Sequence, residues 1–225
     1  MKIRTITEPS SREGKFRYTV RSVETPHGSR QFGLPGSRSG EEEKVWEGTW
    51  QAELKGLDDA WKVKSSRCTE TDGETPSSAV GATADIGVDP GDRVTCTFRL
   101  KLIAPEPGPW TSRTRDHRVS CPGYDESFGP TTAAGTIKVR DGGDHLVARG
   151  LGGRSTTWNL HRDPDDPLRY SGRVRVNQQD ASGTFDLDLR MQGEHKLVGT
   201  FGGQTKVRGI TCKVSSPLTL RFAGD

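Results

Sequence analysis

Residues 93–110, RVTCTFRLKLIAPEPGPW, decide how the chain is divided. Apolar and polar residues alternate through the first half of this stretch, the pattern of a strand with one buried and one solvated face. The buried face of that strand is predicted to carry Val94, Cys96, Phe98 and Leu100. The second half has three prolines between residues 105 and 109, and proline cannot donate to a strand ladder and stiffens a connector. The sequence therefore predicts a first module at 1–103, a proline-rich linker at 104–109 and a second module at 110–225.

The same period-2 alternation recurs on both sides of this boundary. The alternating runs are separated by turns rich in glycine, proline and aspartate, and no run shows a helical period. A chain with 30% hydrophobic residues and 28 glycines, patterned in this way, is typical of half-buried antiparallel strands. We expect an all-β protein. No apolar run approaches the length of a membrane-spanning helix, so no membrane insertion is expected of this segment.

The net charge argues against a nucleic-acid partner. The chain has 33 Lys and Arg against 30 Asp and Glu, a formal charge of +3. Nucleic-acid-binding domains are usually far more basic and concentrate that charge on one face.

Four cysteines, Cys68, Cys96, Cys121 and Cys212, lie two in each predicted module. Four cysteines allow three pairings. We favour Cys68 with Cys96 and Cys121 with Cys212, because this pairing needs no contact between modules and places every cysteine on a predicted strand. An even number of cysteines indicates an oxidising compartment, so we expect an extracellular or cell-surface protein. The first residues show no signal peptide; either a leader has been removed or, as we favour, the chain is a segment of a longer exported protein.

The first module resembles a known family. The stretches GKFRYTV (14–20), QFGL (31–34), EGTWQAEL (47–54) and VDPGDRVTCTF (88–98) are similar to the SpaA/Cna-B-type prealbumin-like domain of bacterial surface proteins, over about residues 1–103. The resemblance implies a seven-stranded β-sandwich that serves as a stalk or repeat in adhesins and pilins. Many such domains carry an intramolecular Lys–Asn isopeptide bond. Here Leu54 stands where its acidic helper is expected, and Arg99 and Leu100 stand where the asparagine is often found, so the disulfide form is implied instead.

The second module is predicted to be an antiparallel meander. Its expected strands are joined by short turns, including Gly202-Gly203, which is typical of sequential pairing. Eight or so antiparallel strands in sequence usually close into a barrel, because closure removes exposed edges. A sandwich is the second choice. The Cys121–Cys212 bridge would tie the first strand to a late one. The stretches DGGDHLVARG (141–150) and HRDPDDPLRYSG (161–172) resemble C-terminal β-domains of secreted multidomain bacterial proteins.

The densest polar cluster is Asp163, Asp165 and Asp166, a candidate binding loop. Three carboxylates in one turn could bind Ca²⁺, but the spacing is not that of an EF-hand, and two prolines already explain a rigid, solvated hairpin. We therefore expect no metal site and no cofactor. No catalytic motif such as GxSxG or HExxH is present, and the predicted disulfides leave no free thiol, so an enzyme is not expected.

These observations favour a non-catalytic, exported surface module that acts as a stalk and in adhesion, display or assembly. Its candidate partners are other surface proteins or glycans, bound outside the barrel at loops such as 124–132 and 163–167. The alternative is a carrier that holds a small ligand inside the barrel, which needs a cavity of roughly 300 Å³ or more. A filled interior is favoured, and its predicted inward residues are Val139, Trp158, Leu160, Val174, Leu187, Leu189, Leu197 and Cys212.

Overall fold

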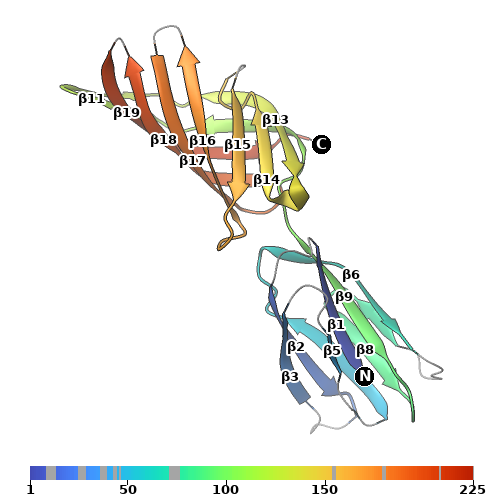
Figure 1. Cartoon of the computed structure of the whole chain (residues 1–225). Coiled ribbons are helices and arrows are strands. Elements are labelled where there is room, and N and C mark those ends of the chain that lie inside the picture. Colours follow the sequence, from blue (N-terminus) through green and yellow to red (C-terminus); the bar gives the residue numbers. More distant parts are fainter. Residues whose placement is uncertain are drawn as a thin grey trace. The chain divides into compact units, whose positions relative to one another are not determined.

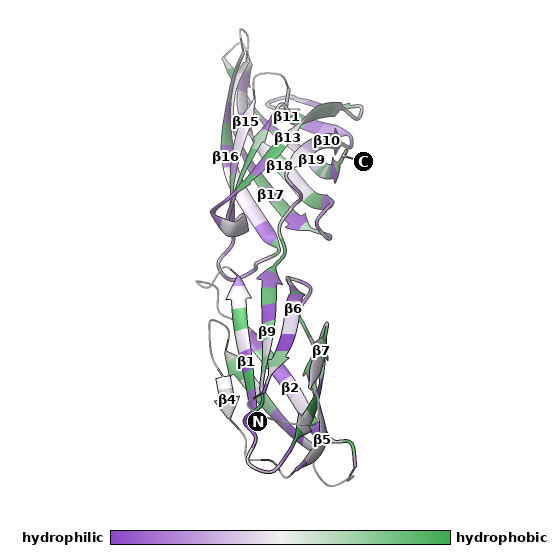
Figure 2. Ribbon diagram, turned by 90° about the vertical axis from the view of Figure 1, so that its right-hand side faces the viewer, coloured by the Kyte–Doolittle hydropathy of each residue, from purple (hydrophilic) through white to green (hydrophobic). Residues whose placement is uncertain are grey.

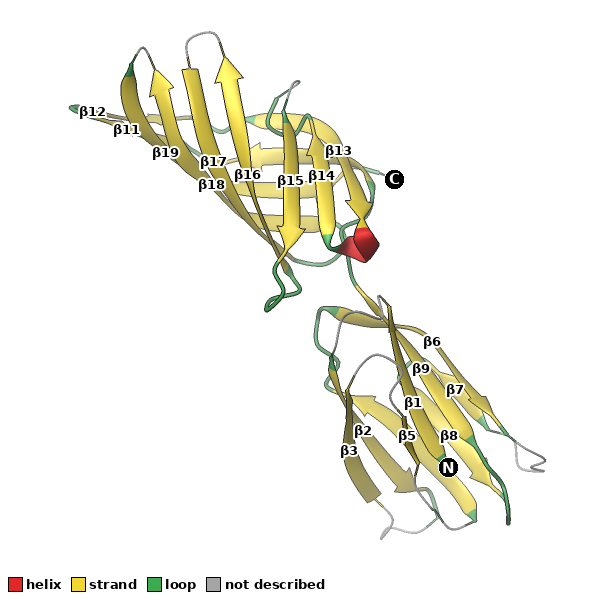
Figure 3. Ribbon diagram, in the orientation of Figure 1, coloured by secondary structure: helices red, strands yellow, loops and turns green. Residues whose placement is uncertain are grey.

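The computed structural model of the chain describes residues 1–8, 14–24, 29–35, 40–42, 45, 47–70, 77–153, 156–178, 181–207 and 209–224. These residues form strands almost throughout, with one turn of 3-10 helix at Asp141–Gly143 (Figure 3). The all-β prediction is confirmed. The chain separates into two compact units, Met1–Leu102 and Ile103–Asp225 (Figure 1). Within the described ranges, no helix is both long and apolar enough to span a bilayer.

The first unit contains two sheets, one with the order β4-β1-β9-β6 and one with the order β3-β2-β5-β8-β7. The strands β1 and β9 run parallel to one another, and the other pairs are antiparallel. The strand bounds are β1 Lys2–Glu8, β2 Lys15–Ser22, β3 Ser29–Pro35, β4 Gly40–Glu42, β5 Gly48–Lys55, β6 Trp61–Thr69, β7 Ser78–Val80, β8 Thr83–Val88 and β9 Thr95–Leu102. These nine strands of the described residues exceed the seven that the family resemblance implies.

The core of the first unit lies between the two sheets. Apolar and polar residues alternate along β9, as Figure 2 shows, and the apolar ones face the core. Tyr18 of one sheet packs against Phe98 of the other at 5.3 Å between ring centroids, and its hydroxyl hydrogen-bonds the buried Thr5 hydroxyl at 2.8 Å. Burial raises the pKa of Tyr18 to about 12. Leu54 is buried, and the first unit contains no asparagine for a Lys–Asn bond.

The second unit is an eight-stranded antiparallel barrel with an added hairpin. The barrel order is β10-β13-β14-β15-β16-β17-β18-β19, and pairing of β10 with β19 closes it. The hairpin β11–β12 extends the sheet by pairing with the first half of β19. The bounds are β10 Gly108–Thr114, β11 His117–Cys121, β12 Tyr124–Phe128, β13 Thr132–Arg140, β14 His145–Arg149, β15 Thr157–Arg162, β16 Arg169–Gln178, β17 Ala181–Met191, β18 Lys196–Val207 and β19 Ile210–Phe222.

Three details of the second unit differ from the expectation. Gly108 and Pro109, assigned to the linker, lie in β10, where the Pro109 carbonyl oxygen accepts a hydrogen bond from Ala223 N–H. The predicted turn Gly202-Gly203 lies inside β18 instead. The disulfides join Cys68 to Cys96 and Cys121 to Cys212, which is the predicted pairing, but the role of the second bridge differs. The second of these fastens the hairpin strand β11 to β19, whereas barrel closure is achieved by the β10–β19 ladder.

Large side chains occupy the barrel interior. Seven of the eight predicted inward residues are buried, and Val139 alone is half-buried. They pack with further interior residues that the prediction did not include, among them Trp110, Ile137, Leu146, Tyr170, Leu218 and Leu220. Gly199 permits a close approach of strands, because a Cβ there would lie 1.8 Å from the carbonyl oxygen of Asp188. An interior lined in this way leaves side chains, and not solvent, at the centre of the barrel.

Candidate functional site

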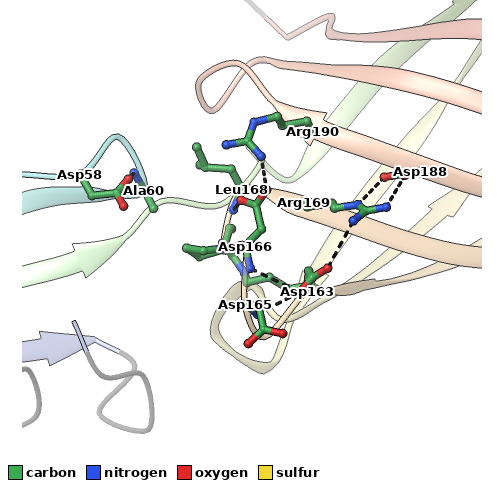
Figure 4. A network of polar contacts seen from close by, with 11 residues as sticks. Asp58, Ala60, Asp163, Asp165, Asp166, Leu168, Arg169, Asp188 and Arg190 are labelled. Atoms are coloured by element: carbon green, nitrogen blue, oxygen red, sulfur yellow. Dashed lines mark hydrogen bonds and ion pairs between the residues drawn. The ribbon is translucent and has the colours of Figure 1, made fainter. Parts of the chain in front are cut away.

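The predicted aspartate loop is a structural turn. The Asp163 carboxylate accepts hydrogen bonds from the backbone N–H groups of Asp165 at 2.9 Å and Asp166 at 3.3 Å. Asp163 also lies 3.7 Å from the guanidinium of Arg169, and Asp166 forms an ion pair with Arg190 (Figure 4). These carboxylates are directed at N–H groups and arginines rather than at a common point. Among the residues that the structure describes, no three potential metal-ligating side chains lie together. The three aspartates of this loop therefore do not form the candidate Ca²⁺ site.

Arg162, directly before this loop, is buried with 5% of its surface exposed. Its guanidinium lies 3.3 Å from the Asp144 carboxylate and 4.9 Å from the ring centre of Tyr170. It also donates to three backbone carbonyl oxygens, those of Ile103, Gly143 and Pro167. The side chain therefore ties Ile103, the first residue of the second unit, to the 3-10 turn and the 163–167 loop at one end of the barrel. This network explains the dense polar sequence without a ligand.

The second predicted binding loop, 124–132, is mostly strand. Tyr124–Phe128 forms β12, an edge strand paired with β11. Tyr124 is 55% exposed and Phe128 is 47% exposed. The prediction missed this strand because its residues are mostly polar or exposed and lack clean alternation.

A different site is formed by the outward side chains of the longest strands. Along β17–β19 the inward residues are buried or half-buried and most outward ones are polar, so register sets which polar groups become neighbours. One row across five strands consists of Arg173, Asp186, Gly202, Ser215 and Arg118. The next row consists of Arg175, Thr184, Gln204, Lys213 and Ser120.

These rows border a groove on the outer face of the barrel, which we call the outer groove. Its main hollow has a volume of about 770 Å³, and a second hollow of about 340 Å³ adjoins it and shares Thr184 and Gln204. The main hollow is lined by Arg118, Ser120, Arg173, Thr184, Asp186, Gly202, Gly203, Gln204, Lys213, Val214 and Ser215. The second adds Arg175, Ser182, Gly183, Thr205, Lys206 and Thr211.

Two adjacent glycines have different roles beneath this groove. A Cβ on Gly203 would lie 2.1 Å from the carbonyl oxygen of Thr184, so the strand can bend there only without a side chain. A Cβ on Gly202 would lie 3.3 Å from the Val214 carbonyl oxygen and 3.8 and 3.9 Å from the Cβ and Cα of Ser215. A side chain at Gly202 would thus need only a small shift of its neighbours, and its absence leaves the floor of the groove without a side chain at this point.

The outer groove is strongly cationic. Its lining holds five basic residues, Arg118, Arg173, Arg175, Lys206 and Lys213, and one acidic residue, Asp186. Asp186 accepts a hydrogen bond from Arg173 at 2.7 Å, which raises the pKa of that guanidinium above its ordinary value. The other four basic side chains are exposed and form no ion pair with any described residue. Such a surface can bind carboxylate, phosphate or sulfate groups through charge-assisted hydrogen bonds.

Local sequence patterns did not reveal this groove, although a signal was present. Arg169, Arg173 and Arg175 alternate with apolar residues along β16 and lie on its solvated face, and Lys206 of β18 and Lys213 of β19 are exposed as well. Only the strand register shows that they meet.

Comparison with known proteins gives no family. No family model matches the chain, and no curated protein matches it. Among solved structures it is similar to a mutant of the vaccine antigen Transferrin Binding Protein B from Haemophilus parasuis, with a TM-score of 0.35 and 8% identity. That similarity covers 92% of this chain but only 44% of the other. A protein of unknown function from Bacteroides ovatus gives a TM-score of 0.29 and 8% identity, covering 94% of this chain and 80% of that one. Neither TM-score is high enough to establish a shared fold, and the SpaA/Cna-B-type resemblance stays a prediction.

Proposed function

We propose that this chain is a non-catalytic, exported binding module, part of a larger extracellular protein, that acts in adhesion, display or assembly. The first unit serves as a stalk, and the barrel binds its partner, a glycan or another surface protein, through the outer groove. The observation that carries the proposal is the set of four exposed cations without an ion pair among the described residues, placed around a floor that Gly202 leaves empty.

Other features agree with this proposal. Two disulfides are typical of proteins that fold in an oxidising compartment outside the cytoplasm. Among the described residues that line the groove, the single carboxylate is held by Arg173, and neither a histidine nor a thiol is present to act as a base or nucleophile. Buried side chains occupy the barrel interior, which favours an outer binding surface over the carrier alternative.

The test places a side chain on the empty floor. We expect Gly202→Thr to abolish binding of the whole chain to immobilised polysaccharides that the unaltered protein binds, because the added side chain fills the groove. Gly33→Thr is the matched control, since Gly33 is also a strand glycine, lies exposed in β3 of the first unit, and a Cβ there meets only the Phe16 carbonyl oxygen at 3.8 Å. Equal binding by both variants would reject the outer groove. Saturable binding of an apolar dye at one site, with displacement of a co-purified small molecule, would instead support the carrier.

A further inference from the structure

We infer that the ligand of the outer groove is an acidic polysaccharide, whose anionic groups are bound by Arg118, Arg175, Lys206 and Lys213. This inference rests on the proposed use of the outer groove for binding. It adds the chemical class of the ligand, and three features of the groove lead to it.

The first feature is the spacing of the cations. Arg175 and Lys213 lie in one row but on β16 and β19, three strands apart, which is roughly 14 Å at the usual distance between neighbouring strands. Arg118 lies one strand further, on β11. A single sugar ring or a free phosphate cannot reach cations so widely spaced at once. An extended chain with repeated negative charges can.

The second feature is the composition between the cations. Hydroxyl and amide side chains fill these positions, and each hydroxyl can both donate and accept hydrogen bonds, as sugar hydroxyls require. They are Ser120, Ser182, Thr184, Gln204, Thr205, Thr211 and Ser215. Among the described lining residues there is no aromatic side chain on which a nucleic-acid base could stack, which disfavours a single-stranded nucleic acid. An acidic peptide would use the cations but offers few hydroxyl groups to these side chains.

The third feature is the floor. Gly202 lies in the row between Asp186 and Ser215, so a polymer can rest directly on the backbone of β18 at that point. The one carboxylate in the lining does not repel an anionic ligand strongly, because Arg173 is bound to it at 2.7 Å.

The experiment compares polymers with one backbone and different charge. Dextran, carboxymethyl-dextran and dextran sulfate are titrated against the whole chain at physiological ionic strength, with polyglutamate and oligo-dT as non-carbohydrate polyanions. We expect both charged dextrans to bind and dextran not to bind. Polyglutamate and oligo-dT should bind more weakly, because they lack sugar hydroxyls.

Two double variants with equal loss of charge locate the site. Arg118→Gln with Lys213→Gln should weaken the binding of carboxymethyl-dextran about tenfold or more, since charge-assisted hydrogen bonds are lost. Arg140→Gln with Arg149→Gln removes two exposed charges from β13 and β14, and should change the affinity less than twofold. Melting curves of all variants show whether each is folded.

The possible failures are distinct. If dextran binds as tightly as its charged forms and Gly202→Thr abolishes this, the outer groove stands and the acidic ligand is wrong. If polyglutamate or oligo-dT binds as tightly as the charged dextrans, the assignment to a polysaccharide is wrong. If both double variants lose affinity equally, binding follows net charge and is not located in the groove. If Gly202→Thr changes no binding at all, the proposed function itself fails.

Discussion

Replacing the buried Arg162 tests how the second unit is held together. Arg162→Met keeps the length of the side chain but removes the charge and every donor. At this end of the barrel, three backbone carbonyl oxygens then lose their hydrogen bond from the guanidinium, and the Asp144 carboxylate loses its ion pair with it. Hydrogen bonds from a charged group contribute about 1.5–3 kcal/mol each, although such values do not add.

An opposing effect reduces this loss. Burial of the guanidinium has a desolvation cost, which methionine avoids, and replacement of buried ion pairs by apolar side chains is sometimes neutral for that reason. Here the acceptors are mainly backbone carbonyls. Those of Ile103 and Pro167 lose the Arg162 donor and stay in place, whereas that of Gly143 keeps a hydrogen bond from the Tyr170 hydroxyl at 2.6 Å. We therefore expect the carbonyl loss to dominate and Arg162→Met to destabilise the second unit by about 3–5 kcal/mol.

The measurement is urea unfolding of the whole chain, with hydrogen exchange to show which unit opens. Exchange should increase in β14–β16 and stay unchanged in the first unit. Arg190→Met is the matched control, because its ion pair with Asp166 is exposed and should contribute less than about 1 kcal/mol. If the two variants unfold at the same urea concentration, the buried network does not stabilise the barrel end, and the reasoning from unsatisfied carbonyls is wrong.

Two further predictions concern the first unit and the long-range disulfide. Because burial raises the Tyr18 pKa to about 12, the folded state keeps the phenol proton above pH 10 while the unfolded chain releases it. The free energy of unfolding should therefore keep its full Tyr18 contribution below pH 10 and fall by about 2–3 kcal/mol as the pH approaches 12. Urea titrations of Tyr18→Phe should show no such loss. Replacing Cys121 and Cys212 by serine removes a link between residues 91 apart in sequence and should lower the free energy of unfolding by about 4–5 kcal/mol. Hydrogen exchange should increase in β11–β12. Unchanged exchange there would contradict the role assigned to this bridge.

The alternation of polar and apolar residues predicted most strands of the barrel wall, but not β10 or the position of the β18–β19 turn. It failed where proline interrupts a strand without ending it. Pro217 lies inside β19, yet the strand continues through it. The Pro217 carbonyl oxygen accepts a hydrogen bond from Arg115 N–H, and only the missing N–H is lost. Pro109 in β10 is a similar case. Closure of the barrel depends on these two strands, so its details could not be obtained from local pattern alone.

The candidate site shows a different limit of sequence reasoning. Asp163, Asp165 and Asp166 are conspicuous because they are adjacent in the chain, but the turn and neighbouring arginines already occupy two of these carboxylates. The cations of the outer groove come from four strands, and Arg118 and Lys213 are far apart in sequence. Only the strand register brings them together, and register follows from pairing across the whole sheet.

The contrast between Arg162 and Arg118 explains why the outer face is the better place for binding. A buried guanidinium is tolerated only when its donors are satisfied, and Arg162 is held by carbonyl oxygens and a carboxylate for this reason. Arg118 is exposed, so water solvates its charge and no protein partner is required. Its donors can exchange water for a ligand anion without breaking any part of the fold. The inward positions of these strands are therefore constrained by packing, whereas the outward positions can be selected for what they bind.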